Sequence, residues 1–354
     1  MTNTQKGKGI AMDPISAETI AGQRLMVGFD GTAFNDDLKW LIGTLQVGGL
    51  ILFSRNLEEP EQIRKLCRDC QAYARQCGLP PLFIAIDQEG GQVARLKPPF
   101  TQFTGNPAMR DIDDAIRFAR VTARELKDMG INMDMAPVLD VAPENTDSIM
   151  AQRVFGSDPQ WVAAMGTTVI DQLQQRGVMA VAKHFPGIGR TVLDSHLALP
   201  DLDADMAALT DVDLVPFAAA IVKKVSGIML SHIRYTAIDP IWPASLSPSV
   251  TTDLLRGQMG YRGVVMTDDL DMGAIKPGYD IDTAIERILL SDVDIALICH
   301  KGPDIEAAWE KIRRAKTEDA DLKDKGALSF RRILELKKNY LSGSWLQRYG
   351  LSAA

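Results

Sequence analysis

The stretch KHFPGIGRTVLDSHLALP (183–200) carries two of the four histidines of the chain. His184 follows a lysine at the end of an apolar run, and His196 stands two residues after Asp194 in a polar loop. In an extended loop, residues i and i+2 point to the same side, so the Asp194 carboxylate can accept a hydrogen bond from one ring nitrogen of His196. That bond fixes the tautomer of the imidazole, and the other ring nitrogen is then free to pass a proton. The spacing therefore indicates a general acid/base.

A carboxylate in another part of the chain is suited to act as a nucleophile. Asp268 follows the apolar run GVVMT (263–267), which has the composition of a buried strand. A carboxylate at the tip of such a strand is held rigidly and is partly desolvated, as a nucleophile requires. The neighbouring Asp269 is interpreted as a helix cap or a supporting hydrogen-bond acceptor. Asp268 and the Asp194–His196 pair are thus the residues that decide the chemistry of the predicted site.

The elements that must position these residues are short β-rich runs, which alternate with longer helical patterns. Eight expected strands, each followed by an expected helix, predict a parallel sheet, and their almost continuous apolar runs fit burial on both faces. Eight such units in 354 residues predict an α/β fold of the closed (β/α)8 barrel type, in a single domain. An open doubly wound sheet is the competing interpretation, but no GxGxxG follows the first strand. The expected strands lie at 24–29, 48–53, 82–87, 131–138, 178–185, 226–233, 262–269 and 293–300.

Several expected strands end in ionisable side chains. Active sites of (β/α)8 barrels lie at the C-terminal ends of the strands, so these side chains should converge on one pocket. A single aspartate at a strand end is as often a helix cap or a turn residue, but five strands that end in this way indicate a shared polar site. The positions are Asp87 and Glu89, Lys183 and His184, Ser231 and His232, Asp268 and Asp269, and His300.

The composition of the chain argues against several classes of partner. Its net charge is −7, whereas a nucleic-acid-binding protein needs a basic surface. No apolar run reaches the roughly 18 residues of a membrane helix. Residues 1–14, which we expect to be a flexible N-terminus, lack the apolar core of a signal peptide. We therefore expect a cytoplasmic protein with its one domain in residues 15–354, and with neither a nucleic acid nor a membrane as partner.

Three of the four cysteines, Cys67, Cys70 and Cys77, lie on one expected helix. Cys67 and Cys70 could share a metal or a redox bridge, but no second Cys or His pair stands nearby in the sequence to complete a zinc site. They are interpreted as ordinary thiols of a surface helix. Four cysteines in 354 residues do not indicate a disulfide scaffold.

The motifs at the expected strand ends resemble glycoside hydrolase family 3, and in particular its β-N-acetylglucosaminidase branch. The loop pattern of that branch, KH-[FI]-PG-[HL]-G-x4-D-[ST]-H, matches residues 183–196 except at Ile188, where the pattern has His or Leu. Arg190 stands where the family frequently has Asp, which changes the local electrostatics of the loop. The resemblance covers about residues 20–345. Further motifs in the same order are IAIDQEGGQVARL (84–96), APVLDV (136–141), RVFGSDP (153–159) and GVVMTDDLDMGAI (263–275).

The resemblance implies a retaining, two-step hydrolysis of terminal β-linked N-acetylglucosamine. Asp268 would be the nucleophile that forms a glycosyl-enzyme, and His196, oriented by Asp194, would be the acid/base. Retaining enzymes usually use two carboxylates, so the histidine is the unusual part. Asp140 is expected to brace the pocket loops. The residues implied to bind the sugar hydroxyls are Asp87, Arg95, Arg153, Lys183 and His184.

The family branch and the expected location together predict a substrate from cell-wall turnover. That substrate is N-acetylglucosamine β-1,4-linked to 1,6-anhydro-N-acetylmuramic acid, with or without its peptide, and its hydrolysis is a step of peptidoglycan recycling. No metal and no cofactor is expected, and the protein is expected to be a monomer.

Three alternatives remain open. A phosphorylase would use phosphate instead of water as the acceptor. A β-glucosidase of the same family would place a Glu acid/base in an additional domain. A non-catalytic sugar-binding barrel belongs to a different class of protein, and the presence of Asp268, Asp194 and His196 argues against it.

Overall fold

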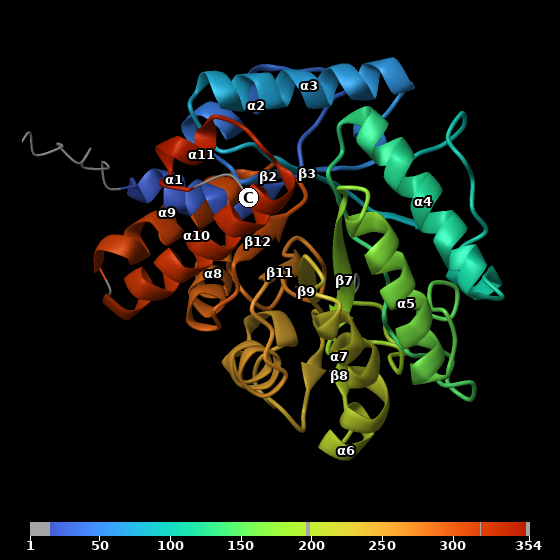
Figure 1. The fold of residues 1–354 in the computed structure, drawn as a ribbon. Coiled ribbons are helices and arrows are strands. Elements are labelled where there is room, and N and C mark those ends of the chain that lie inside the picture. The colour runs from blue at the N-terminus through green and yellow to red at the C-terminus, as the bar shows by residue number, and fades with distance from the viewer. Residues whose placement is uncertain (1–14, 196–198, 319, 352–354) are drawn as a thin grey trace, which may run out of the picture.

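The computed structural model describes residues 15–195, 199–318 and 320–351. Eight parallel strands close into a barrel, in which neighbouring strands follow the order β1-β12-β11-β9-β7-β6-β3-β2 (Figure 1). The prediction of a (β/α)8 barrel is therefore confirmed. The barrel strands are β1 (Leu25–Val27), β2 (Gly49–Leu52), β3 (Phe83–Ile86), β6 (Met133–Asp134), β7 (Met179–Phe185), β9 (Gly227–Leu230), β11 (Val264–Asp269) and β12 (Ile295–Ile298).

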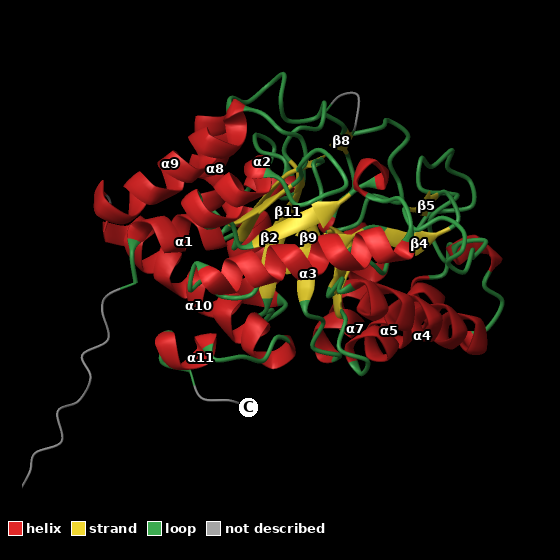
Figure 2. Cartoon of the chain, turned by 90° about the horizontal axis from the view of Figure 1, so that it is seen from above, coloured by secondary structure: helices red, strands yellow, loops and turns green. Residues whose placement is uncertain are grey.

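Helices surround the barrel, and α4 packs on α5, which packs in turn on α7 (Figure 1). Figure 2 shows long loops gathered at one end of the barrel and α10 and α11 at the other end. Among the described residues, no helix combines the length and the apolarity needed to cross a membrane. The larger helices are α1 (Ala17–Gln23), α3 (Pro60–Gln76), α4 (Ile112–Met129), α5 (Pro159–Gln174), α7 (Leu214–Val222), the π-helix η6 (Ser249–Gln258), α8 (Ile281–Leu290), α9 (Pro303–Glu318) and α10 (Ala320–Tyr340). The short ones include α2 (Asp36–Lys39), α6 (Met206–Ala208), α11 (Trp345–Arg348) and the π-helices η1 (Trp40–Thr44) and η4 (Leu209–Asp213).

Two small sheets shape the loops that follow the barrel strands. β4 (Gln88–Gly90) and β5 (Val93–Ala94) form an antiparallel pair directly after β3. β8 (Asp201–Leu202) pairs in parallel with β10 (Arg234–Tyr235), and so joins the loop after β7 to the loop after β9. The loops after β3 and β7, which carry predicted site residues, are therefore each held by strand pairing.

The observed strands are shorter than expected, and their irregularities fall at functional positions. Pro137 lies in the run expected to be the fourth strand, and because proline has no N–H to donate, β6 ends at Asp134. The pairing of β7 with β9 shifts register between Ala182 and Phe185, and that of β11 with β12 shifts between Met266 and Asp269. Such irregularities re-aim side chains, and these two contain Lys183, His184 and Asp268.

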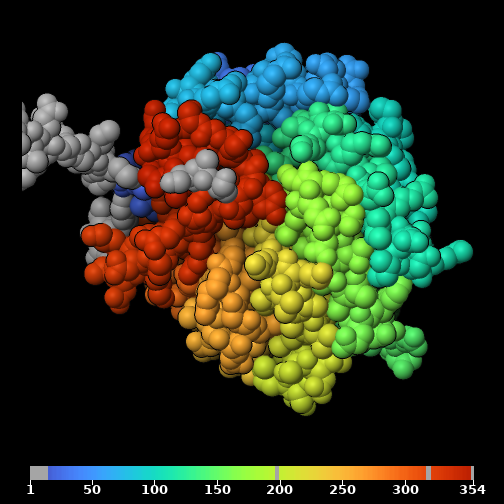
Figure 3. All heavy atoms as spheres, in the orientation of Figure 1, coloured from blue at the N-terminus to red at the C-terminus, as the bar shows by residue number. Residues whose placement is uncertain are grey.

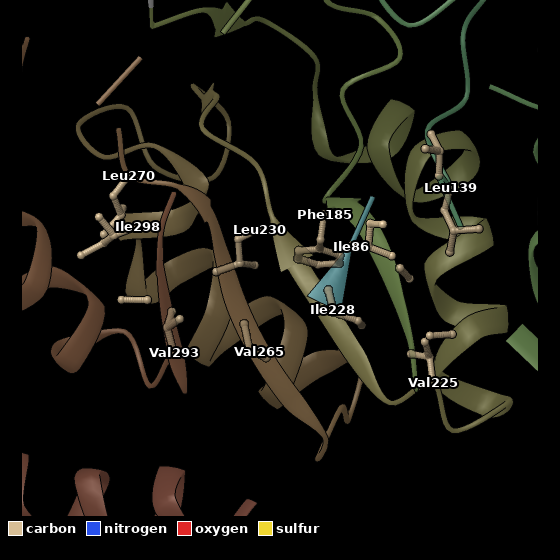
Figure 4. Close-up of a cluster of buried hydrophobic side chains, with 14 of the residues drawn as sticks. Ile86, Leu139, Phe185, Val225, Ile228, Leu230, Val265, Leu270, Val293 and Ile298 are labelled. Carbon is tan, nitrogen blue, oxygen red and sulfur yellow. The ribbon is translucent and has the colours of Figure 1, made fainter. Parts of the chain in front are cut away.

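Side chains of the strands alternate between two buried layers, as a period of two requires. Met179 and Val181 of β7 point into the barrel interior, where methionine is frequent, while Ala180 and Ala182 face the surrounding helices. Figure 4 shows part of the outer layer, with Ile86, Phe185, Ile228, Leu230 and Val265 among its side chains. Phe185 meets Phe217 of α7 edge to face at 5.2 Å. Both layers hold the strand ends in fixed positions.

α10 closes the end of the barrel opposite the long loops. Its Ile333 and Leu336 join the interior cluster of side chains. Lys337 is completely buried there, and its Nζ donates to Gln23 Oε1 at 2.6 Å and to the Gly48 carbonyl at 2.9 Å. Burial holds the pKa of Lys337 well below its ordinary value. The base of the barrel is therefore plugged, and the chemistry must lie at the other end.

The cysteines of α3 differ from the prediction in one respect. Cys67 and Cys70 are buried against the core rather than at the helix surface, and only Cys77 is exposed. All four cysteines of the chain are free thiols. Burial raises the pKa of Cys67 to about 12, so this thiol packs as a small apolar side chain.

Candidate active site

Predicted site residues from four barrel strands meet at the C-terminal end of the barrel. Asp87 follows β3, Lys183 and His184 lie in β7, His232 follows β9, and Asp268 lies in β11. Lys183, His184 and His232 are each less than 5% exposed, although all three are polar. Buried polar groups need partners, and those partners are the other members of the site.

Three cations and two carboxylates form a largely buried ion network at the C-terminal end of the barrel. The Nζ of Lys183 lies 2.7 Å from Asp87 Oδ1 and 2.7 Å from Glu89 Oε1. Arg153 donates two hydrogen bonds to Glu89, at 2.9 and 2.7 Å. Arg95 Nη2 donates to Asp87 at 3.3 Å. The structure thus brings together Asp87, Arg95, Arg153 and Lys183, and adds Glu89 as the bridge between two of the cations.

The network keeps its carboxylates ionised. Burial alone would raise the pKa of Asp87, but the charges of Lys183 and Arg95 outweigh it and hold that pKa well below its usual range. The pKa of Glu89 is lowered in the same way by Lys183 and Arg153. An ionised carboxylate can only accept hydrogen bonds, so Asp87 can accept from sugar hydroxyls while the cations donate to others.

Asp87 should link folding stability to pH. A carboxyl group whose folded pKa is depressed contributes stability above its unfolded pKa of about 3.9, and that stability is lost as the pH falls. We expect Asp87→Asn to lower the free energy of unfolding by about 3 kcal/mol at neutral pH, because it unpairs a buried charge. The difference in the free energy of unfolding between Asp87→Asn and the unaltered chain should become steadily smaller below about pH 4, and urea unfolding over that range would measure it. A difference independent of pH would contradict the ionised network.

His184 is held by a buried aspartate. Asp140 Oδ2 lies 2.7 Å from His184 Nδ1, and both side chains are buried. The other oxygen of Asp140 accepts from the backbone N–H of His184 at 3.3 Å and from that of Ile188 at 2.8 Å. An ionised carboxylate requires the proton on Nδ1, so Nε2 of His184 is the nitrogen left for a substrate or a neighbouring group. The expectation that Asp140 braces the loop agrees with these contacts.

The Asp140–His184 contact yields a mutational prediction. In Asp140→Asn, the amide can donate to Nδ1 and so favour the opposite tautomer of His184. We expect kcat/KM to fall by about 10- to 100-fold with little loss of stability, because the amide oxygen can still accept from the loop. Steady-state kinetics across pH, with Ile188→Leu as a packing control in the same loop, would measure the effect. Equal losses in the two variants would show that loop packing matters, rather than the tautomer.

Asp268 lies beside two histidines. Its Oδ1 accepts from the Asp269 N–H at 2.8 Å. Burial raises the pKa of Asp268, but His184, His232 and this backbone N–H outweigh it, so the pKa lies below its ordinary value. His232 donates from Nε2 to the Asp269 carbonyl at 2.9 Å, and its Nδ1 lies 2.7 Å from Ser245 Oγ. An ionised carboxylate that is held by its own backbone has the form that a nucleophile requires.

The loop that carries the predicted acid/base is anchored at several points. Asp194 is half-buried, and the Ser195 carbonyl next to it accepts from the Ala274 N–H at 3.0 Å, which joins this loop to the one after β11. His196 lies outside the described residues, so its distance from Asp194 and from Asp268 stays a prediction. Ile188 is buried, with a loop-packing role. Arg190 donates from Nε to the buried Asp213 at 2.9 Å, which gives this departure from the family pattern a structural partner.

The remaining polar residues at the mouth support the backbone. Asp269 accepts from the N–H groups of Asp271 and Cys299, in agreement with its interpretation as a supporting acceptor. Together with the exposed His300, Asp269 and Asp271 could in principle ligate a cation. Lys276 Nζ already lies 2.7 Å from Asp271 Oδ1, however, and supplies positive charge to this cluster.

Sequence reasoning missed two links of the site. Glu89 was noted only as a strand-end residue, yet it pairs with Arg153 across 64 positions of the chain. Asp134 is fully buried and accepts from the Gln88 N–H, and Gln88 Oε1 accepts in turn from the Arg95 N–H. The available signal was that Asp134 is the one acidic residue within the fourth expected strand, 131–138.

A rigid aspartate beside a buried ion network, at the C-terminal end of the strands of a (β/α)8 barrel, is the arrangement of a barrel enzyme that acts on a polar substrate. A model of the glycosyl hydrolase family 3 N-terminal domain matches residues 16–336. The chain therefore belongs to glycoside hydrolase family 3, as its motifs predicted.

The chain is similar in sequence to two β-hexosaminidases and in structure to a β-N-acetylglucosaminidase. The chain is 36% identical over 292 residues to a β-hexosaminidase of Alkalilimnicola ehrlichii, with 80% of this chain and 82% of that protein aligned. It is 36% identical over 326 residues to β-hexosaminidase A of Pseudoalteromonas piscicida, with 81% and 54% aligned. A solved family 3 β-N-acetylglucosaminidase from Paenibacillus sp. superposes with a TM-score of 0.89 at 36% identity, over 94% of this chain and 64% of that one. The chain thus spans about half of the Pseudoalteromonas protein and less than two thirds of the Paenibacillus protein.

Proposed function

We propose that this protein is a retaining exo-β-N-acetylglucosaminidase, which removes terminal β-linked N-acetylglucosamine through a covalent glycosyl-enzyme. The observation that carries the proposal is the placement of Asp268 at the tip of β11, where its Oδ1 accepts from the Asp269 N–H at 2.8 Å and where His184 and His232 are its neighbours. The names of the relatives, β-hexosaminidase and β-N-acetylglucosaminidase, support the choice of sugar.

The proposed first step forms the glycosyl-enzyme. A carboxylate oxygen of Asp268 attacks the anomeric carbon, and the bond from that carbon to the leaving oxygen breaks. The imidazolium of His196 gives its proton to the departing oxygen, so the aglycone leaves as an alcohol. Asp194 accepts a hydrogen bond from the other ring nitrogen and stabilises the charged ring.

The second step returns the enzyme to its starting state. Neutral His196 takes a proton from a water molecule, and the oxygen of that water attacks the anomeric carbon. The bond to Asp268 breaks, and the sugar leaves with the β configuration that it had in the substrate, because two inversions restore it. Asp87, Arg95, Arg153, Lys183 and His184 are proposed to hold the sugar hydroxyls in both steps, and Glu89 keeps two of these cations in place.

The finer parts of the proposal concern substrate and setting. We propose N-acetylglucosamine β-1,4-linked to 1,6-anhydro-N-acetylmuramic acid, with or without peptide, as the substrate, and peptidoglycan recycling as the process. The support for this choice is the loop of residues 183–196, which matches the pattern of the β-N-acetylglucosaminidase branch at every specified position except Ile188. The cytoplasm and a monomeric state stay predictions, and cell fractionation and light scattering would test them.

Product analysis separates this proposal from its alternatives. Purified protein should release 4-nitrophenol from the β-N-acetylglucosaminide much faster than from the β-glucoside. With phosphate present, proton NMR should show free N-acetylglucosamine, initially as the β anomer, and mass spectrometry should show the disaccharide fragment being cleaved. A sugar phosphate as the main product would indicate a phosphorylase. Preference for the glucoside would indicate a β-glucosidase, and binding without turnover would indicate a sugar-binding barrel.

A further inference from the structure

Two adjoining grooves run along the side and the base of the barrel, away from the mouth. The first follows α4, has a volume of about 790 Å³ and is lined by residues from Asp113 to Asp128 together with Arg176. The second has a volume of about 1180 Å³ and lies between the ends of α5, α7 and α10. Both grooves are lined by Lys127 and Arg176, so they form one continuous depression, which we call the basal groove. Figure 3 shows this face, where α10 in red meets the green end of α5 and the yellow end of α7.

The basal groove is strongly basic, although the chain as a whole is acidic. Three carboxylates, those of Asp113, Asp128 and Glu335, line it, whereas the net charge of the chain is −7. The basal groove therefore carries a net positive charge, whereas the chain as a whole carries a net negative charge. The cations that line it are Arg117, Arg120, Arg124, Lys127, Arg176, Lys223, Lys224, Arg262, Arg331 and Arg332.

Most of these cations have no carboxylate within ion-pair distance among the residues that the structure describes. Lys223 pairs with Asp171, and Arg332 pairs with Asp292 and Asp294. The other eight form no such pair, whereas the lysines elsewhere on the surface include several that do. The field of the basal groove is therefore not cancelled locally, and it can attract an external anion.

The arrangement on α4 places four positive charges in one row. Arg117, Arg120, Arg124 and Lys127 follow one another at spacings of three and four residues, so they form one row along the exposed face of the helix. Like charges at these spacings repel by a few tenths of a kcal/mol for each pair, and Asp113 and Asp128, each four residues from an arginine of the row, offset part of that repulsion. The row spans about 15 Å at 1.5 Å per residue, which suits an extended chain of anions better than a single ion.

We propose that the basal groove binds a flexible chain of phosphate groups. Seven of its ten cations are arginines, whose planar guanidinium groups match phosphate oxygens in pairs. A bilayer is flat, whereas this surface is concave and continues around the side of the barrel. The groove also offers few ring faces on which nucleic-acid bases could stack, because its two aromatic lining residues are Tyr261, which is buried, and Tyr340, which is half-buried.

Calorimetric titration of linear inorganic polyphosphate into the full chain tests the proposal. If the eight unpaired cations make contacts, the affinity should fall by roughly 10³-fold or more between about 50 mM and about 200 mM salt. The variant Arg120→Gln, Arg124→Gln, Arg331→Gln removes three exposed cations from two sides of the groove. It should weaken binding and reduce the slope of log affinity against log salt by about 2, at roughly 0.7 for each cation.

A matched control keeps the same change of net charge. Arg68, Arg75 and Arg110 are exposed and lie outside the groove, so their replacement by Gln together should leave the affinity and the slope unchanged. Hydrolysis of a chromogenic sugar should be unaffected in both triple variants, because the mouth lies at the other end of the barrel. Equal weakening in the two variants, or no binding of polyphosphate at low salt, would overturn the proposal. Tighter binding of single-stranded DNA, of polyglutamate or of anionic vesicles than of polyphosphate would also overturn it.

Discussion

Asp268→Ala should lower kcat for a β-N-acetylglucosaminide by roughly 10⁴- to 10⁶-fold, the range expected when an enzyme loses its covalent nucleophile. Without this carboxylate no glycosyl-enzyme can form, while the ion network around Lys183 stays in place. KM should therefore change much less than kcat. Steady-state kinetics with a 4-nitrophenyl substrate would measure the loss, and circular dichroism would show that the fold is kept.

The neighbouring carboxylate supplies the control for this prediction. Asp269 accepts from two backbone N–H groups, and the amide oxygen in Asp269→Asn can accept from both. We expect that variant to lose no more than about tenfold in kcat, an effect of misplacement rather than of lost chemistry. If the two variants lost activity to the same degree, or if Asp269→Asn lost more, the nucleophile would be wrongly assigned.

Azide offers a second readout for Asp268→Ala. The small anion can occupy the space of the missing carboxylate and attack the anomeric carbon directly, with the leaving group departing as before. One displacement inverts the configuration, so the product should be the α-glycosyl azide. Recovery of a β-glycosyl azide would mean that a covalent intermediate still forms on another group.

Lys183→Met should affect both stability and activity. Its ammonium group lies 2.7 Å from Asp87 and 2.7 Å from Glu89, and all three side chains are largely buried. Removing one partner of a buried ion pair costs about 3–5 kcal/mol, because the other charges are left uncompensated. Loss of a charged donor to the sugar and displacement of Asp87 should lower kcat/KM by roughly 10²- to 10³-fold. Urea unfolding and steady-state kinetics on the same preparation would measure both effects.

Lys337→Met is a matched control for Lys183→Met. Lys337 is also buried, but its ammonium group donates to Gln23 and to the Gly48 carbonyl at the base of the barrel. We expect a smaller loss of stability, because methionine can fill the space and no carboxylate is left unpaired, and we expect kcat/KM to be unchanged. If Lys183→Met lost stability but kept its kcat/KM, the ion network would serve the fold rather than the substrate.

The barrel could be predicted from the sequence because its signal is periodic and local. Runs such as GVVMTDD and VMAVAKHF combine a buried strand with a polar end, and the closed topology follows once eight of them alternate with helices. The shortening of the fourth strand at Asp134 was less predictable, since apolar residues continue through Met135, Ala136 and Val138, and Pro137 is the one residue among them that cannot donate a backbone hydrogen bond.

The pairing of charges across the site could not be predicted in the same way. Which acid meets Arg153 depends on the loop geometry after β3, and the hairpin of β4 and β5 brings Glu89 to it, while Asp87 turns toward Lys183. The partner of Arg190 is Asp213 on a π-helix, which no pattern around Arg190 indicates. Cys67 and Cys70 are buried because they lie on the face of α3 that packs against the core. The spacing of the two cysteines in the sequence does not show which face of the helix that is.

The basal groove could not be predicted from the net charge of the whole chain. The net charge of −7 led to the expectation that no nucleic acid would bind, and the same average hides ten cations gathered on one face. Arg117, Arg120 and Arg124 are visible in the sequence as a helical row, whereas Arg176 and Arg331 join them only through the packing of α4, α5 and α10.

Covalent trapping tests the central claim most directly. A fluorinated N-acetylglucosaminyl donor that forms the glycosyl-enzyme quickly and hydrolyses it slowly should inactivate the protein, and peptide mass spectrometry should locate the sugar on Asp268. A label on Asp87, Asp269 or any other side chain would contradict the mechanism. Release of a sugar oxazoline from an unlabelled protein would contradict it equally, since the acetamido group of the substrate would then be the nucleophile.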